Sequence, residues 1–423
     1  MTYYALFFHM RESKMMSALF TGVSGLKSHQ VQLDVIGNNI ANVNTIGFKS
    51  GRAIFKDIFN QTLKSASSSN ELAGGVNPQQ VGNGVTIGAI DNIFTQGSLE
   101  FTNNASDLAI QGAGFFVLSD GNTRSYTRTG TFEINRNGYL VDPASGLVVQ
   151  GKMATNGKLS EGTIDNIHLP FGKNLPASAT TTVVLESNLD ARTAEGTSGD
   201  TTTFDVYDSL GNSHPVSVGF TKTGENQWTW NATINGAAVG NGNIAFNPNG
   251  SLKSADGNPL SFNPQNGAEA MTITLDFGAP NTTDGLSQLA STSTVTAKNQ
   301  NGYGMGVLEG FNVDESGTIR GVFSNGVSQV LGQVALAHFN NPGGLTKAGS
   351  SLYKESGNSG QAILGRPGVG GLGSIAPGAL EMSNVDLTTE FTKMILAQRG
   401  FQANARIIST ADAILGELVT LRS

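Results

Sequence analysis

The feature that most constrains this chain is a pair of apolar heptad repeats at its opposite ends. Near the N-terminus, apolar residues recur at every seventh position from Leu19 to Ile40, and near the C-terminus from Leu387 to Leu415. A seven-residue apolar period is typical of helices that pack as a coiled coil. A single helix of about 25–30 residues is only marginally stable in water. We therefore predict that the two ends form helices that bury each other, with the alternative that each packs on a β domain as ordinary core.

The predicted coiled-coil seam contains the heptad residues together with the apolar residues that share their helix face. Its members are Leu19, Val23, Leu26, Leu33, Ile36, Ile40, Val43, Leu387, Met394, Phe401, Ile408, Leu415 and Leu418.

Between the two ends, the composition is typical of turn-rich β structure. Glycine supplies 55 of the 423 residues, nearly twice its usual share of about 7%. Residues 131–142 (TFEINRNGYLVD) have a near copy at 310–321 (GFNVDESGTIRG), about 180 residues further on. The pairs Asn137-Gly138 and Asn249-Gly250 predict type I′ hairpin turns, in which both central residues take a positive φ. The two similar hairpins predict one β domain that is interrupted by an insertion.

We therefore predict a multidomain chain, mainly β with α-helical coiled-coil termini, in which discontinuous domains are nested. Residues 1–15 are expected to be a disordered extension, or sequence ahead of a true start at Met16. The predicted domains are a terminal helical coiled coil (16–48 with 380–423), linker segments (49–90 with 355–379), an inner β domain (91–167 with 305–354) and an inserted outer β domain (168–304).

Charge and composition exclude several classes of function. The 25 basic and 32 acidic residues leave a net charge of −7, so no basic surface for nucleic acid is expected. Cysteine is absent, which excludes disulfides, thiolate nucleophiles and cysteine-ligated zinc. No window approaches the ~18 apolar residues of a membrane span. The apolar first ten residues lack the positive charge and cleavage site of a signal peptide, so neither membrane insertion nor signal cleavage is expected.

Several sequence patterns resemble catalytic motifs but lack the neighbouring residues or elements that those motifs require. Gly146–Lys152 has the spacing of a phosphate-binding loop, but Met153 occupies the position where Ser or Thr must hold magnesium. Gly368–Gly373 has the spacing of a dinucleotide fingerprint, yet Pro377 lies where the following helix should run. The five histidines are scattered without paired ligand spacing. We predict no enzyme, and no catalytic, cofactor-binding or metal-binding residue.

Four asparagines are concentrated at the end of the predicted N-terminal helix, at positions 38, 39, 42 and 44. Asparagine is a poor helix former because its side chain competes for backbone hydrogen bonds. Two interpretations remain open: a frayed helix end, or amides that bridge to neighbouring chains. Gly47 is expected to be the residue that ends the helix, with Phe48 folding back onto its last turn.

The stretch NNIANVNTIGFK (38–49) resembles the signature of the bacterial flagellar rod, hook and hook-associated family. The sequence from Met16 to this motif resembles that family's N-terminal end, and residues 379–423 resemble its C-terminal end. Residues 107–151 look like the family's shared β domain. The residues that match the motif are Asn38, Asn39, Ile40, Ala41, Asn42, Thr45, Gly47, Phe48 and Lys49.

Residues 181–191 and 202–224 are similar to the outer domain of the family's hook subunits, whereas 226–304 are only a plausible continuation of it. The resemblance implies a structural subunit, outside the cell, that polymerises into a flexible curved tube and transmits torque from the rod to the filament. The seam residues would then also carry contacts of the polymer. The implied partners are further copies of the chain, the rod, the hook cap, the hook–filament junction proteins and the flagellar type III export apparatus.

Two other functions remain as alternatives. A distal rod subunit would be shorter and would lack the outer-domain motifs. A β-rich cell-surface hydrolase would need a convergent acid–base or metal cluster, and the sequence offers none.

Overall fold

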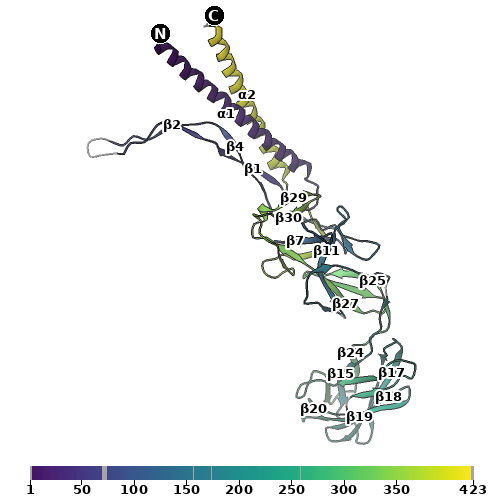
Figure 1. The fold of residues 1–423 in the computed structure, drawn as a ribbon. Helices are drawn as coiled ribbons and strands as arrows, with labels where there is room; N and C mark the ends of the chain where they lie inside the picture. Colours follow the sequence, from purple (N-terminus) through teal and green to yellow (C-terminus); the bar gives the residue numbers. More distant parts are fainter. Residues whose placement is uncertain (1, 69–73, 156, 173, 258, 421–423) are drawn as a thin grey trace. The chain divides into compact units, whose positions relative to one another are not determined.

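The computed structural model describes residues 2–68, 74–155, 157–172, 174–257 and 259–420, without the side chains of residues 2–17, 418 and 419. The chain is mainly β with a long helix at each end, as predicted, and it forms two compact units (Figure 1). Among the described residues, no helix is long and apolar enough to cross a membrane. The first unit comprises Met1–Leu169, Val313–Ile319 and Leu331–Ser423, and the second comprises Pro170–Asn312 and Arg320–Val330.

The two terminal helices, α1 (Thr2–Ala41) and α2 (Leu387–Thr420), pack against each other in the first unit (Figure 1). Helix α1 begins at Thr2, where the sequence analysis expects a disordered extension, because residues 2–16 contain neither glycine nor proline to interrupt a helix. It ends at Ala41, six residues before Gly47. The Asn42 side chain donates to the Asn38 carbonyl (2.9 Å), and such competition for backbone groups favours a helix end.

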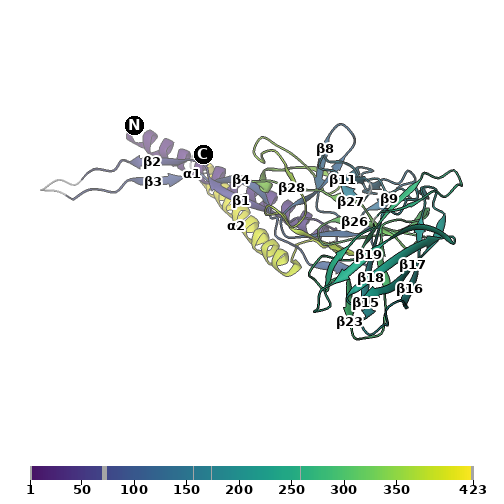
Figure 2. The ribbon, with the colours of Figure 1, turned by 90° about the horizontal axis from the view of Figure 1, so that it is seen from below.

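Residues 51–68 and 74–92 form a two-stranded arm, in place of the predicted linker (Figure 2). Its base packs on α1, where the backbone N–H of Val85 donates to Ser24 Oγ (3.3 Å) and the rings of Phe55 and His29 meet at 5.6 Å. The strands of the arm are β1 (Gly51–Asp57), β2 (Asn60–Lys64), β3 (Gln79–Gly82) and β4 (Val85–Asn92), with β1 paired to β4 and β2 to β3, both antiparallel.

The inner β domain of the first unit surrounds an aromatic core. The rings of Phe115, Tyr126, Phe339 and Tyr353 are all buried there. Its elements are β5 (Leu99–Phe101), β6 (Leu108–Gln111), β7 (Phe115–Ser119), β8 (Arg124–Thr127), β9 (Glu133–Ile134), β10 (Leu140–Val141), β11 (Val148–Thr155), β12 (Lys158–Leu159), β13 (Asp165–Asn166), β28 (Leu336–His338), η1 (Pro342–Gly344), β29 (Thr346–Gly349), β30 (Leu352–Lys354), β31 (Ile363–Gly365), β32 (Ser374–Pro377) and β33 (Ala379–Glu381). Within it, β7 pairs with β8, β11 and β28, while β33 pairs with β5 and β32 with β6.

Five hairpin turns share one geometry. In each, the first residue donates its N–H to the carbonyl of the fifth, and the fourth residue, a glycine with positive φ, donates to the carbonyl of the first. The predicted type I′ turns at Asn137-Gly138 and Asn249-Gly250 are wrong, because only the glycine takes a positive φ. The side chain of the first residue accepts further N–H groups in most of these turns, so one left-handed residue is enough. The first residues are Asn135, Asp208, Asn247, Asp314 and Phe323.

The second unit contains a β sandwich with a single core that includes both tryptophans, Trp228 and Trp230. One sheet is antiparallel in the order β16-β17-β18-β19-β20, and the other has the order β21-β22-β15-β23 with β24 also paired to β15. The strands are β14 (Asn174–Leu175), β15 (Thr182–Asp190), β16 (Ser198–Tyr207), β17 (Ser213–Gly224), β18 (Gln227–Ile234), β19 (Ala237–Phe246), β20 (Leu252–Ala255), β21 (Leu260–Phe262), β22 (Met271–Asp276), β23 (Leu286–Leu289) and β24 (Thr296–Gln300). Three further strands, β25 (Gly306–Val313), β26 (Thr318–Phe323) and β27 (Ser328–Val334), have residues assigned to both units.

One buried carboxylate, Asp208, ties together two hairpins of the sandwich. It accepts hydrogen bonds from His214 Nε2 (3.0 Å), Asn212 Nδ2 (3.1 Å) and Asn266 Nδ2 (2.7 Å). Desolvation acts to raise the pKa of Asp208, but these hydrogen bonds outweigh it and hold the pKa well below its ordinary value. The connection between β16 and β17 is thereby linked to the connection between β21 and β22.

Candidate assembly site: the helix pair and the buried clamp

The two terminal helices approach most closely where one of them carries a glycine. A Cβ added to Gly25 would lie 2.6 Å from Asn404 Nδ2, and a Cβ added to Gly400 would lie 2.5 Å from His29 Nε2. Because real Cβ atoms do not come that close to other atoms, a Cβ at either position would force the end of the Asn404 or His29 side chain to move while the helices keep this separation. The contact between the chain ends is therefore centred on small residues.

The structure brings the predicted seam residues together only in part. The small residues at the contact between the helices are Gly22 and Gly25 on α1 and Gly400 on α2, and Ala397 and Ala411 on α2 are buried. The heptad leucines lie beside these small residues and are only partly buried, because the neighbouring glycines are the positions at which the two helix backbones approach each other. Of the predicted seam, Ile36 is buried, Leu19, Leu26, Leu33, Ile40, Val43, Met394, Ile408 and Leu415 are partly buried, Val23, Leu387 and Phe401 are exposed, and the side chain of Leu418 lies outside those described.

One asparagine of the motif, Asn39, makes contacts within the chain. Asn39 is buried; its Nδ2 donates to the Gly51 carbonyl (2.8 Å) and to Glu390 Oε2 (3.0 Å), and its Oδ1 accepts from the Gly51 N–H (2.9 Å). Asn39 thus joins α1, the base of the arm and the first turn of α2. The hypothesis that these amides bridge to neighbouring chains therefore does not apply to Asn39, whose amide is used internally. Asn38 and Asn44 are exposed.

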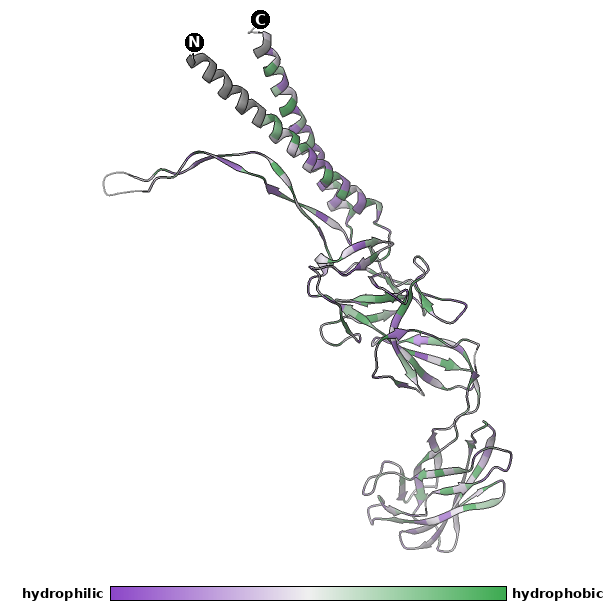
Figure 3. Cartoon of the chain, in the orientation of Figure 1, coloured by the Kyte–Doolittle hydropathy of each residue, from purple (hydrophilic) through white to green (hydrophobic). Residues whose placement is uncertain are grey.

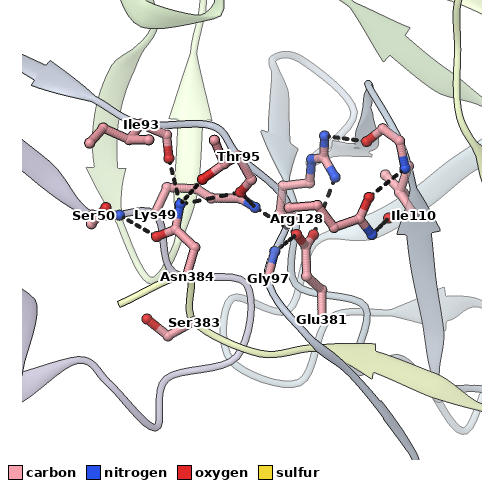
Figure 4. A network of polar contacts seen from close by, with 12 residues as sticks. Lys49, Ser50, Ile93, Thr95, Gly97, Ile110, Arg128, Glu381, Ser383 and Asn384 are labelled. Carbon is pink, nitrogen blue, oxygen red and sulfur yellow. Dashed lines mark hydrogen bonds and ion pairs between the residues drawn. The ribbon is translucent and has the colours of Figure 1, made fainter. Parts of the chain in front are cut away.

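The motif ends in a buried charge cluster, here called the clamp, formed by Lys49, Arg128 and Glu381 (Figure 4). Lys49 Nζ lies 2.6 Å from Glu381 Oε1, and Arg128 Nη1 lies 3.2 Å from Glu381 Oε2. The side chains of Lys49 and Glu381 are fully buried, and that of Arg128 is 4% exposed. The clamp joins the N-terminal motif, the residue that directly follows strand β8, and strand β33 of the C-terminal segment.

The clamp carries one more positive charge than negative. Burial lowers the pKa of Lys49 and of Arg128, and the carboxylate of Glu381 opposes this in both cases. The remaining donors reach backbone carbonyls, with Lys49 Nζ on Thr95 (2.8 Å) and Arg128 Nη2 on Gly112 (2.8 Å). Arg128 Nε is the buried side-chain polar atom that lacks a hydrogen-bond partner among the described residues.

Asn384 connects the same segments through backbone groups beside the clamp (Figure 4). Its Oδ1 accepts from the Ser50 N–H (2.8 Å), and its Nδ2 donates to the carbonyls of Ile93 (2.8 Å) and Thr95 (3.2 Å). Gly47, at a φ of +66°, donates its N–H to the Glu381 carbonyl (2.7 Å). The motif residues Gly47 and Lys49 therefore fix the C-terminal segment to the inner β domain.

Sequence reasoning did not identify Glu381, Asn384 or Arg128 as partners of the motif. The available signal was weak: Glu381 lies inside an otherwise uncharged stretch, residues 367–385, in a chain with only 13% charged residues. Within the described residues, no group of three or more potential ligands is placed to hold a metal ion.

Large apolar side chains remain exposed on the helix pair and on the arm. Figure 3, coloured by residue hydropathy, shows that hydrophobic and hydrophilic residues alternate along α2. On α2 they include Ile395 (58% exposed) and Leu396 (66%), and on the arm Phe59 is exposed by 75%. Exposed apolar patches on a soluble chain commonly mark surfaces that bind another protein. The helix pair and the arm thus present apolar surface that no other described part of the chain covers.

Comparisons with known proteins match almost the whole chain to flagellar components. The matched family descriptions are Flagella basal body rod protein (residues 19–49), Flagellar hook protein FlgE/F/G D1 domain (109–185), Flagellar basal body protein FlaE D2 domain (174–303) and Flagellar basal body rod FlgEFG protein C-terminal (376–421). The matched models thus place rod-type sequences at both chain ends and hook-type β domains between them. This combination defines the class of flagellar rod and hook proteins.

Similarity to individual proteins extends over full lengths. The flagellar hook protein FlgE of Borreliella burgdorferi is 41% identical over 97% of this chain and 100% of its own, and that of Treponema pallidum is 41% identical over 96% and 100%. The flagellar basal-body rod protein FlgG of Bacillus subtilis is 30% identical over 96% of this chain and 100% of its own. The chain belongs to the flagellar hook protein FlgE family.

Proposed function

We propose that this chain is a structural subunit of the bacterial flagellar hook, and that it polymerises into a flexible curved tube that transmits torque from the rod to the filament as a universal joint. The observation that carries the proposal is the full-length similarity to hook proteins. The greater identity to FlgE than to FlgG, together with the matched D2 domain at 174–303, favours the hook over the distal rod. A role without catalysis fits a family of structural proteins.

The proposed mechanism assigns different tasks to the chain ends and to the inserted lobe. The exposed apolar faces of α1, α2 and the arm would be buried by other copies, so that ordering of the helices is coupled to assembly. Tightly interlocked ends would give a tube that is stiff in twist. The inserted domain, residues 168–304, would lie outermost, where polar, hydrated contacts can slide and re-form at modest cost while the bent tube rotates.

The remaining partners follow from the same proposal. The polymer would contact the rod at its base and the cap and hook–filament junction proteins at its tip. Each subunit would reach the outside of the cell through the flagellar type III export apparatus without cleavage of a signal peptide.

Electron microscopy of flagella labelled with antibody and gold tests the assignment. The antibody is raised against residues 168–304, so that it also reports whether this lobe is accessible. Gold confined to the short curved segment between cell and filament is the expected result. Gold scattered over the cell surface and absent from flagella would contradict it and would favour the surface-hydrolase alternative.

Deletion of 168–304 tests the division of tasks. Tubes that still form but lose their curvature are expected. Tubes of unchanged curvature would show that the lobe does not govern bending.

A further inference from the structure

A pocket in the inner β domain lies directly beside the clamp. It has a volume of about 270 Å³, and Phe94, Phe115, Phe339 and Pro342 form its apolar lining. Arg128 lines the same pocket, with its guanidinium carbon 5.4 Å from the centre of the Phe115 ring. The pocket therefore combines aromatic walls with one nearly buried cation.

The charge at this pocket is not balanced within the described chain. Lys49 and Arg128 share the single carboxylate of Glu381, and the amine of Lys347 is near them, 3.5 Å from the Lys49 carbonyl. A buried charge without a partner is unfavourable unless another group pairs with it. Arg128 Nε also lacks a hydrogen-bond acceptor. A group that carries a carboxylate next to an aromatic ring would pack against the aromatic walls of the pocket and pair with the Arg128 guanidinium.

The chain carries such a pair on its arm. Phe59 is the most exposed large hydrophobic side chain among the described residues (75%), and Asp57, two residues earlier, is also exposed. The backbone holds this corner in place, because Ile58 donates its N–H to Gly84 O (3.2 Å) and Phe59 accepts from the Asn83 N–H (2.9 Å). A preformed corner loses little conformational entropy on binding.

We propose that the pocket beside Arg128 receives the Asp57–Phe59 corner from the arm of a second copy of this chain, with the Phe59 ring against the aromatic walls and the Asp57 carboxylate toward the guanidinium. This deepens the proposed function and rests on it, since it requires a polymer. It also gives the unbalanced clamp a role: the last negative charge is supplied only on assembly. Arg128 is then a residue that positions the incoming arm.

Disulfide trapping in the full chain tests this contact, because the chain has no cysteine of its own. Asn60→Cys, next to Phe59 on the arm, is combined with Ala113→Cys on the exposed rim of the pocket. Two cysteines can be joined only when their Cα atoms come within about 7 Å. The purified variant is polymerised, oxidised and run on a denaturing gel. A ladder of cross-linked chains, at least tenfold stronger in polymer than in monomer, is expected.

The matched control moves the arm thiol along the same strand. Lys64→Cys with Ala113→Cys places it four residues away, about 13 Å at ~3.3 Å per residue, and should give no ladder. In the Asn60/Ala113 pair, Asp57→Asn should lower the cross-linking yield about fivefold, while Lys56→Gln should leave it unchanged.

The outcomes separate this proposal from the proposed function. A polymer that forms normally, but in which the Asn60/Ala113 pair cross-links no better than the control, overturns the pocket contact and leaves the hook assignment intact. Equal cross-linking in monomer and polymer also overturns it, because the contact would then lie within one chain. A wild-type chain that forms no polymer under conditions that assemble related subunits overturns both.

Discussion

The sandwich of the second unit satisfies its side chains internally, whereas the helix pair and arm of the first unit do not. In the sandwich, strands such as β22 alternate buried and exposed residues along their whole length, and both tryptophans are fully buried. On α2, by contrast, Ile395 and Leu396 are mostly exposed, and the contact with α1 is made through glycine and alanine. A lobe with a closed apolar core can fold by itself. The helix pair meets through small residues and, like the arm, leaves large apolar side chains exposed, which further chains would cover in the proposed polymer.

The largest effect is expected in the core of the sandwich. Trp228→Ala should lower the free energy of unfolding of the second unit by about 4–5 kcal/mol, because it leaves a large cavity and removes the donor to Gln288 Oε1. Both tryptophans of the chain lie in this unit, so the fluorescence of Trp230 still reports its urea unfolding. The exposed residue Leu210 provides the control, since Leu210→Ala should change stability by less than about 0.5 kcal/mol. An equal loss in both variants would contradict a closed core.

The second effect concerns the clamp. Glu381→Gln should destabilise the first unit by about 3–4 kcal/mol, because Lys49 and Arg128 lose their only carboxylate. Calorimetry should show the transition of the first unit at a lower temperature, while the tryptophan transition of the second unit stays in place. Glu133→Gln, at an exposed position of the same unit, is the matched control. A shift of both transitions together would show that the two units do not unfold independently.

A smaller effect is expected at Asp208. Asp208→Asn should cost about 2 kcal/mol at neutral pH, because the amide presents donors to groups that themselves donate. The pKa of Asp208 is lower in the folded chain than its ordinary value, so its contribution is present above about pH 4 and is lost as the pH falls through the folded value. Urea unfolding followed by tryptophan fluorescence should therefore show the difference between wild type and Asp208→Asn shrinking below pH 4. A difference that is constant down to pH 2 would contradict this.

The smallest effect distinguishes two helical glycines. Gly25→Ala should loosen the helix pair by about 1–2 kcal/mol, since the new Cβ would meet Asn404. Gly37→Ala should stabilise α1 by up to about 1 kcal/mol, because nothing lies within 4 Å of its Cβ position. Hydrogen exchange of the α1 amides in the assembled polymer measures both. Changes of opposite sign in the stability of α1 in the two variants would support a helix contact centred on Gly25, and changes of the same sign would contradict it.

The elements that sequence could predict are those encoded by local pattern. The heptads predicted the two terminal helices and their pairing, and the near copy of 131–142 at 310–321 correctly predicted two equivalent hairpins. The residues at which the two helices touch could not be predicted. The leucine spacing identifies the apolar face of each helix, whereas the glycines at the edge of that face determine how closely the helices approach. The arm was missed because the serine-, asparagine- and glycine-rich sequence between its strands, from residue 64 onward, is typical of a linker. The predicted turn type was wrong because Asn135 Oδ1 accepts hydrogen bonds from the backbone N–H groups of Asn137 and Tyr139, which stabilise a turn with a single positive φ.

The clamp was the part of the candidate site that sequence could predict least. Lys49 was identified through the motif, but its partner Glu381 lies 332 residues further along the chain. Only the fold brings β33 beside β5 and places Arg128 at the end of β8. A single buried charge in an uncharged stretch indicates a partner without identifying it.

Hydrogen exchange measured by mass spectrometry on the monomer and on the assembled polymer tests the central claim most directly. If other copies complete the chain ends, the amides of α1, α2 and the arm exchange rapidly in the monomer and become strongly protected in the polymer. The amides of β16–β20 in the sandwich should be equally protected in both states. Chain ends that are already protected in the monomer, or protection gained in the sandwich alone, would contradict the account.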